Sequence, residues 1–145
     1  MITESIEIAR PPEEVFAYLN QLERHGEWQG AIIESRLETE GPVRVGTRAT
    51  DVRRVPGGKQ AVTYEITEYE PPRRTAFRGV KGPVRPIGTV TVEPLEGGAR
   101  SLVTLELDLQ GHGWGKLVAP MARRQARKEL PGNQKALKER LEAGV

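Results

Sequence analysis

The strongest constraint on the fold is a series of strand-like segments joined by short glycine and proline turns. Six segments between residues 32 and 109 have the alternation or composition of β-strands. They are Ile32–Thr39, Thr47–Val55, Gln60–Glu70, Arg73–Val80, Pro86–Leu95 and Ala99–Leu109. A parallel connection needs a crossover of about a dozen residues or more, which these turns do not supply. The sequence therefore predicts one antiparallel meander.

Another strand and two short helices are predicted before the meander. Ile2–Ile8 alternates between apolar and polar residues, as a half-buried strand does. Helical spacing then begins near Pro12, where a proline suits the first turn and the following acidic residues complement the helix dipole. Asn20 predicts a bend, after which a second short helical piece runs towards Trp28.

The last third of the chain has the pattern of an amphipathic helix. Apolar residues recur at three- and four-residue multiples from Trp114 to Leu141, while a basic cluster at 123–128 lies on the other side. Pro131 and Gly132 fall in the middle of this pattern, and an interior proline costs a helix about 3 kcal/mol. We expect two helical segments that meet near residue 131.

Composition limits the classes of protein. The chain of 145 residues has the size of one domain, expected over residues 1–145. Its 22 basic and 20 acidic residues give a net charge of +2, which gives little support to nucleic-acid binding. Without cysteine there is no disulfide and no thiolate metal site, and two histidines do not make a three-histidine zinc site. We expect no metal and no cofactor.

The N-terminal residues carry charges and contain no apolar run of signal-peptide length. Nowhere does the chain contain 18 consecutive apolar residues. We therefore expect a cytoplasmic protein that does not insert stably into a membrane.

Several segments together resemble a known family. The run IEIARPPEEVFAYLNQLERHGEW, the GPVRVGT turn, the strand pair YEITEYEPPRRTAFR and the C-terminal ALKERLE occur in the order typical of the polyketide cyclase/dehydrase and lipid-transport superfamily, the SRPBCC or START-like group. The resemblance implies an α+β helix-grip fold, in which a curved antiparallel sheet wraps around a long C-terminal helix. It also implies a hydrophobic cavity between sheet and helix, which members use for lipid or polyketide binding, for ligand sensing or, less often, for ring-closing and dehydrating chemistry.

Eight residues are candidates to contact a ligand in such a cavity. Trp28 and Trp114 flank the sheet in the sequence, Tyr64 has a hydroxyl on the apolar side of its strand, and Arg78 is a candidate anchor for an anionic group. The other candidates are Phe77, Leu105, Leu117 and Met121. Each also has a purely structural interpretation, as a core aromatic, a satisfied buried hydroxyl or a solvated arginine.

Three functional hypotheses follow. The first is a binding or carrier protein for a small hydrophobic molecule such as a lipid or a polyketide-like compound. The second is a cyclase or dehydratase that uses Tyr64, His112 or Arg78 as polar groups in an apolar chamber. The third is a protein-interaction module that uses the basic helix. The sequence indicates no catalytic residue with a recognisable partner and leaves the ligand and the oligomeric state open.

Overall fold

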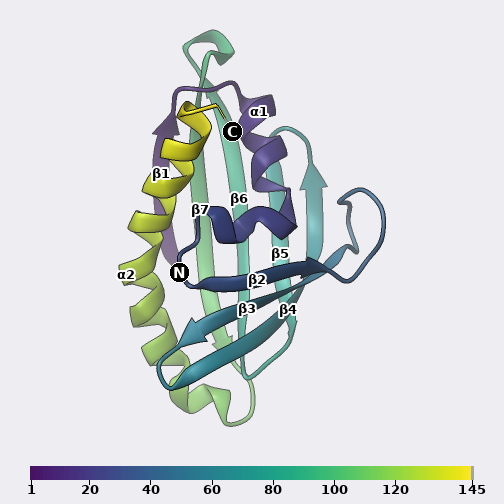
Figure 1. The fold of residues 1–145 in the computed structure, drawn as a ribbon, viewed down its shortest axis with the longest axis vertical. Helices are drawn as coiled ribbons and strands as arrows, with labels where there is room; N and C mark the ends of the chain where they lie inside the picture. Colours follow the sequence, from purple (N-terminus) through teal and green to yellow (C-terminus); the bar gives the residue numbers. More distant parts are fainter. Residues whose placement is uncertain (145) are drawn as a thin grey trace.

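The computed structural model describes residues 1–144 and contains one antiparallel sheet of seven strands (Figure 1). In the order β1-β7-β6-β5-β4-β3-β2, neighbours in the chain are neighbours in the sheet, except that β1 pairs with β7. The strands are β1 Ile2–Ile8, β2 Ile32–Leu37, β3 Arg48–Val55, β4 Gly58–Glu70, β5 Arg74–Lys81, β6 Val84–Leu95 and β7 Arg100–Gly111. The predicted meander is confirmed.

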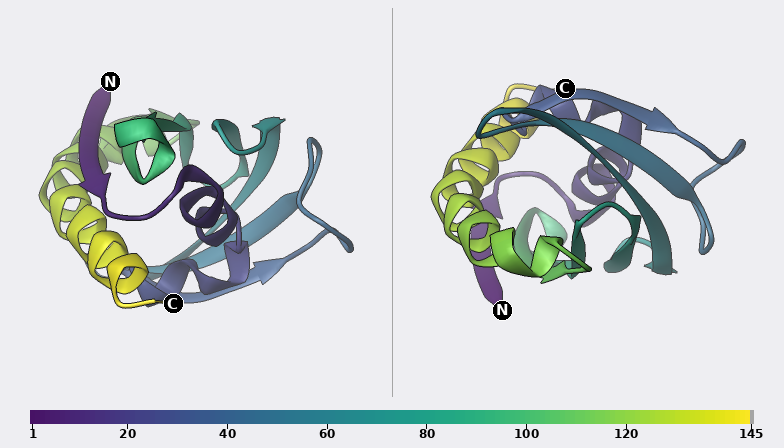
Figure 2. Two further views of the ribbon diagram at one scale, coloured as in Figure 1. Left: turned by 90° about the horizontal axis from the view of Figure 1, so that it is seen from above. Right: turned by 90° about the horizontal axis from the view of Figure 1, so that it is seen from below.

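Two α-helices and two short 3-10 helices accompany this sheet. They are α1 Pro12–Leu19, the 3-10 helices η1 Leu22–Glu27 and η2 Glu96–Gly98, and α2 Gly115–Glu142, of which η2 lies in the β6–β7 turn. Seen along the long axis, the sheet curls around α1, and α2 lies along the open side (Figure 2). This is the predicted arrangement of a curved sheet with two short helices after the first strand and a long C-terminal helix.

Two apolar clusters fill part of the space inside the curl. The first joins α1 and the C-terminal half of α2 to β1, β6 and β7, and the second joins η1 to β3 and β4. Their buried members are Ile8, Val15, Phe16, Tyr18, Leu19, Val92, Val103, Leu137 and Leu141 in the first, and Leu22, Ala49, Tyr64 and Ile66 in the second.

The C-terminal end of α2 is attached to the segment that connects β1 to α1. Arg10 donates from Nε to the carbonyl of Leu141 at 2.9 Å and from Nη2 to the carbonyl of Glu142 at 3.0 Å. The backbone N–H of Ala9 donates to the Glu142 carboxylate at 2.8 Å. These bonds satisfy carbonyl groups that a helix end leaves without partners, and they fix the end of α2 on the sheet.

The predicted break of the C-terminal helix near residue 131 is wrong, because α2 is one helix of 28 residues with Pro120 and Pro131 inside it. Pro131 is exposed, and so is Arg127, whose carbonyl loses its usual helical partner and can bond to water instead. Leu130 and Leu137 on either side of the proline are buried in the protein. Tertiary packing on both sides of the proline thus outweighs its local cost.

Replacing either helix-breaking residue should therefore stabilise the protein. Pro131→Ala restores a helical hydrogen bond and is expected to raise the free energy of unfolding by roughly 1–3 kcal/mol. Gly132→Ala should have a smaller effect and raise the free energy of unfolding by about 1 kcal/mol, because a Cβ at this position meets no atom within 4 Å. Urea unfolding followed by circular dichroism measures both, and a Pro131→Ala protein less stable than the wild type would contradict this explanation.

Candidate functional site

The concave face of the sheet carries two aromatic side chains placed opposite glycines. In the strand register Tyr64 faces Gly79, and Phe77 faces Gly88. A Cβ on Gly88 would lie 2.4 Å from the carbonyl oxygen of Glu106 and 3.0 Å from the Phe77 ring, so only glycine fits there. The two rings lie 6.1 Å apart at 68°, an edge-to-face contact. Gly88 thus lets the Phe77 ring lie against the sheet.

Part of the concave face is covered less completely than the rest. Helix α2 packs against β1, β7 and β6, α1 packs against β6 and β7, and η1 covers β2 at the other edge of the sheet. Apolar side chains that share this face but remain partly exposed are Phe77, Val84, Val90, Leu105, Leu107 and Leu109. They extend from the two clusters towards the end of the sheet where α2 begins, and they form an apolar surface next to Tyr64.

Two buried hydrogen-bond donors on the inside have no partner. Within residues 1–144, the side-chain atoms Trp28 Nε1 and Tyr64 Oη are buried and accept or donate no hydrogen bond. Tyr64 is 7% exposed, and burial raises the pKa of its hydroxyl well above the ordinary value. Buried polar groups are almost always satisfied by protein, water or ligand, so each of these two donors is a candidate to bond a water or a ligand.

His25 lies beside Trp28, with the two ring centroids 5.4 Å apart in an edge-to-face contact. Its Nε2 is 2.7 Å from the carbonyl oxygen of Leu19. A carbonyl only accepts, so Nε2 carries the hydrogen and Nδ1 keeps its lone pair in the neutral ring. Burial lowers the pKa of His25, although the negative charge of Asp51 opposes this effect.

Asp51 of β3 is a buried carboxylate on the concave face of the sheet, the face that also carries Tyr64. It accepts a hydrogen bond from the Ser35 hydroxyl at 2.8 Å and lies 3.8 Å from the guanidinium of Arg53. Arg53 in turn donates to the Gln29 side chain at 2.8 Å. The charge of Asp51 also contributes, after burial, to the raised pKa of Tyr64. Polar groups from η1, β3 and β4 therefore share one region of the interior.

The structure brings four of the eight sequence candidates to the inside. Tyr64, Phe77 and Leu105 lie on the concave face, as their strand registers require, and Trp28 packs against the first apolar cluster. The four candidates that it does not bring there are Arg78, Trp114, Leu117 and Met121.

The other four candidates lie outside for reasons of periodicity. Arg78 follows the inward-facing Phe77, so its side chain lies on the convex face, where it is exposed and 3.6 Å from Glu65. Trp114, Leu117 and Met121 are exposed, while Gly115 and Ala119 supply the buried side of the same helical turns. Of the polar groups considered for catalysis, Arg78 and His112 are exposed, and only Tyr64 faces inwards.

His25 and Asp51 were missed by the sequence analysis. The position of Asp51 could have been predicted from strand alternation, because Asp51 lies two residues after Ala49 and therefore on the same face of β3. The position of His25 could not have been predicted in this way, since its approach to Asp51 depends on how η1 lies over the curled sheet.

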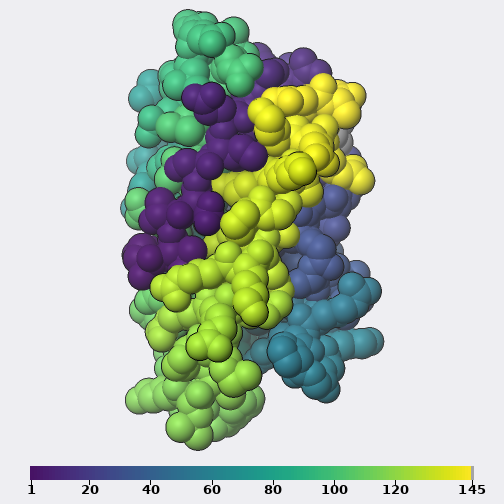
Figure 3. Space-filling view, turned by 90° about the vertical axis from the view of Figure 1, so that its left-hand side faces the viewer, coloured from purple at the N-terminus to yellow at the C-terminus, as the bar shows by residue number. Residues whose placement is uncertain are grey.

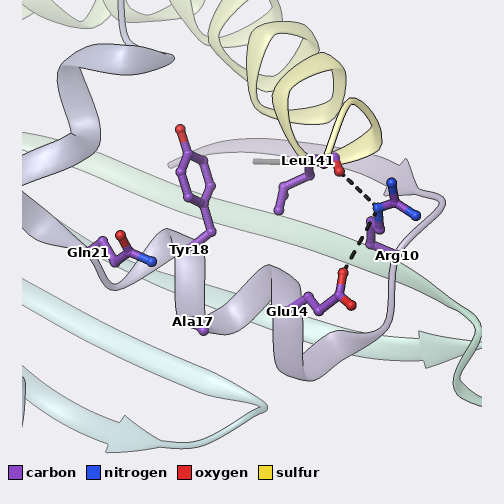
Figure 4. A pocket seen from close by; sticks show the side chains of 7 residues that line it. Arg10, Glu14, Ala17, Tyr18, Gln21 and Leu141 are labelled. Atoms are coloured by element: carbon purple, nitrogen blue, oxygen red, sulfur yellow. Dashed lines mark hydrogen bonds and ion pairs between the residues drawn. The ribbon is translucent and has the colours of Figure 1, made fainter.

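Two open hollows lie elsewhere, at the C-terminal end of α2. One of about 410 Å³ is lined by Arg10, Glu14, Ala17, Tyr18, Gln21, Leu141 and Gly144 (Figure 4). The other, of about 550 Å³, is lined by Glu27, Ala136, Glu139, Arg140, Ala143 and Gly144. Arg10 is engaged with the end of α2, and the Tyr18 hydroxyl donates to Glu27 at 2.8 Å. Their polar groups therefore have structural roles, which makes the concave face the better candidate.

The lowered pKa of His25 predicts a specific acid sensitivity. A histidine whose pKa is lower in the folded state stabilises the fold fully above its unfolded pKa, and this contribution is lost as the pH falls towards the folded pKa. The free energy of unfolding should therefore decrease as the pH falls below about 6.5, the ordinary pKa of histidine, and His25→Gln should flatten this part of the curve. His112→Gln, at the exposed histidine, is the matched control. An unchanged slope in His25→Gln would contradict the assignment.

We also searched the described residues for a metal site and for a membrane-spanning helix. Among the described residues, no three histidine, aspartate or glutamate side chains gather closely enough to hold a metal ion. No helix in residues 1–144 is both long and apolar enough to cross a membrane.

Comparisons with known proteins agree with this fold. The uncharacterized protein Rv1546 of Mycobacterium tuberculosis is 29% identical over 138 residues, which cover 93% of this chain and 92% of that protein. A START superfamily protein from Mycobacterium smegmatis superimposes with a TM-score of 0.80 at 16% identity and covers 99% and 98% of the two chains. The aromatase/cyclase Zhui from a Streptomyces species gives 0.78 at 14% identity, with 97% and 92% covered.

At these identities the two structures establish the fold alone, and they confirm the START-like helix-grip arrangement. The family model for polyketide cyclase/dehydrase and lipid-transport proteins matches residues 1–142. The chain therefore belongs to the polyketide cyclase/dehydrase and lipid-transport family.

Proposed function

We propose that this protein binds a small, mainly apolar molecule on the concave face of the sheet and that the ligand carries at least one hydrogen-bond acceptor. The observation that carries the proposal is the pair of buried, unpartnered donors Trp28 Nε1 and Tyr64 Oη. A buried polar group without a partner costs about 1–3 kcal/mol. An acceptor oxygen on a ligand would remove that cost for the donor that it reaches.

The surroundings of these donors favour an apolar ligand body. Phe77, Leu105 and the neighbouring partly exposed aliphatic side chains offer hydrocarbon to such a ligand. Binding sites for small molecules commonly combine such an apolar lining with a few convergent polar groups. Membership in a family described by polyketide chemistry and lipid transport supports the same class of ligand.

A second candidate function, ring-closing or dehydrating catalysis, is favoured by His25. Burial lowers the pKa of this histidine and so favours its neutral form, in which the bond to Leu19 leaves Nδ1 unprotonated, as a general base requires. His25 and Tyr64 both lie within electrostatic range of Asp51. One similar structure is named an aromatase/cyclase. The carrier function needs fewer assumptions, because it requires only the unpartnered donors and the apolar surface.

The direct test is native mass spectrometry of the protein purified from cells, followed by extraction into organic solvent. We expect a bound small molecule that is released by the solvent. A Trp114→Phe variant supports the measurement, because Trp28 then remains as the one tryptophan and its fluorescence should change when extracted lipids are added back. Protein that carries no small molecule, and whose Trp28 emission ignores every extract, would refute the proposal.

Two tyrosine variants separate ligand binding from stability. Tyr64→Phe removes a hydroxyl without a protein partner, so the free protein should be as stable as the wild type or slightly more stable, while the affinity for the extracted ligand falls about fivefold. Tyr18→Phe is the matched control, because its hydroxyl donates to Glu27. It should lower the free energy of unfolding by about 1 kcal/mol and leave the affinity unchanged. The opposite pattern, a destabilised Tyr64→Phe with wild-type affinity, would show that the hydroxyl has a structural role.

A further inference from the structure

The charges of this nearly neutral protein are strongly segregated. Residues 53–60, 78–86 and 109–128 together contain 11 basic residues and no acidic residue. The remaining 11 of the 22 basic residues share the rest of the chain with all 20 acidic residues. The net charge of +2 therefore hides a basic region and an acidic remainder.

The fold gathers these three segments at one end of the molecule, which we call the basic end. In an antiparallel meander alternate turns lie at the same edge of the sheet, and the β3–β4 turn, the β5–β6 turn and the β7–α2 connection are such alternate turns. The backbone N–H of His112 donates to the carbonyl of Pro83 at 2.8 Å, which joins two of them. Figures 1 and 3 show the β3–β4 hairpin and the first half of α2 at the same end.

Most cations of the basic end are free to meet a partner. Three have ion-pair partners, namely Arg53 with Asp51, Arg78 with Glu65, and Arg123 with Asp108. Within residues 1–144 the other eight form no ion pair. They are Arg54, Lys59, Lys81, Arg85, Lys116, Arg124, Arg127 and Lys128.

The same end exposes large apolar side chains. Trp114, Leu117 and Met121 are 66%, 83% and 65% exposed. Their spacing of three and four residues places them on one stripe of α2, which we call the apolar stripe. Gly115 holds this part of the helix close to the β5–β6 turn, because a Cβ there would lie 1.8 Å from the carbonyl oxygen of Pro83. The stripe is therefore displayed by a fixed helix.

We propose that the basic end docks on the surface of an anionic lipid membrane, with the apolar stripe inserted at the level of the headgroups. A helix with an apolar face and flanking cations lies in the membrane interface and is attracted by anionic lipids. Tryptophan favours that interface. A nucleic acid or an acidic protein would use the cations, but neither explains three exposed apolar side chains between them. This inference concerns the outer surface and stands independently of a ligand on the concave face.

Vesicle flotation of the full chain tests the proposal. We expect the protein to float with vesicles of equal parts phosphatidylcholine and phosphatidylglycerol and to stay unbound with phosphatidylcholine alone. Added salt should weaken binding, since the attraction is screened. In a Trp28→Phe variant, the emission of Trp114 should shift to shorter wavelength on binding. Failure to float with the mixed vesicles, or equal floating with both kinds, would overturn the proposal.

Two sets of substitutions separate the contribution of the cations to vesicle binding from that of the apolar stripe. Lys116→Gln, Arg124→Gln and Lys128→Gln together should weaken vesicle binding about 100-fold, at about fivefold for each cation near the surface. Leu117→Ser with Met121→Ser should weaken it at least tenfold. The matched controls are Lys135→Gln, a cation outside the basic end, and Val45→Ser, where the side chain is 61% exposed at the β2–β3 connection.

All substituted side chains are exposed, so melting followed by circular dichroism should show unchanged folding. Binding that is lost in the cationic set but kept in the apolar set would overturn the membrane assignment in favour of an acidic macromolecule. A DNA duplex and an acidic protein, added as competitors in that case, identify which class binds. Equal losses in the control variants would show that no specific surface exists.

Discussion

The architecture depends on how the C-terminal end of α2 is attached to the sheet. Leu137 and Leu141 are buried in the first apolar cluster, and Arg10 donates to two of the last carbonyl groups of the helix. Burial of two leucines contributes about 3–6 kcal/mol, which is comparable to the whole stability of many domains. The attachment lies at one end, whereas the first half of α2 contacts the sheet through Gly115, Ala119 and the Arg123–Asp108 ion pair and keeps an exposed apolar stripe.

This attachment also divides the concave face into two parts. Where α1 and the second half of α2 meet the sheet, side chains such as Val92 and Val103 are almost fully buried. Further along β7, Leu105, Leu107 and Leu109 remain partly exposed although they lie on the same face. A natural fold keeps unsatisfied groups such as those of Trp28 and Tyr64 at sites that serve function more than stability.

Periodicity predicted the secondary structure well, because a strand with one buried face must alternate and the short turns permit only antiparallel neighbours. It failed at Pro131, where the cost of proline is local but the packing of Leu130 and Leu137 that outweighs it is tertiary. Alternation also places Arg78 opposite to Phe77, so its outward position was available from the sequence. The side of α2 that packs on the sheet could not be predicted, since the sequence of a helix with more than one apolar stripe does not show which stripe is buried.

The two proposals are physically compatible because they use neighbouring parts of the molecule. The partly exposed apolar surface begins at Phe77, whose ring contacts that of Tyr64, and runs along β7 towards the end where Gly111 meets the first turn of α2. A ligand with its acceptor at Trp28 or Tyr64 and its apolar body along this surface would point towards the apolar stripe. If the basic end lies on a membrane, that ligand would have an apolar route between bilayer and interior. The charge segregation would then orient the protein, since an anionic surface attracts the basic end and repels the acidic remainder of the molecule.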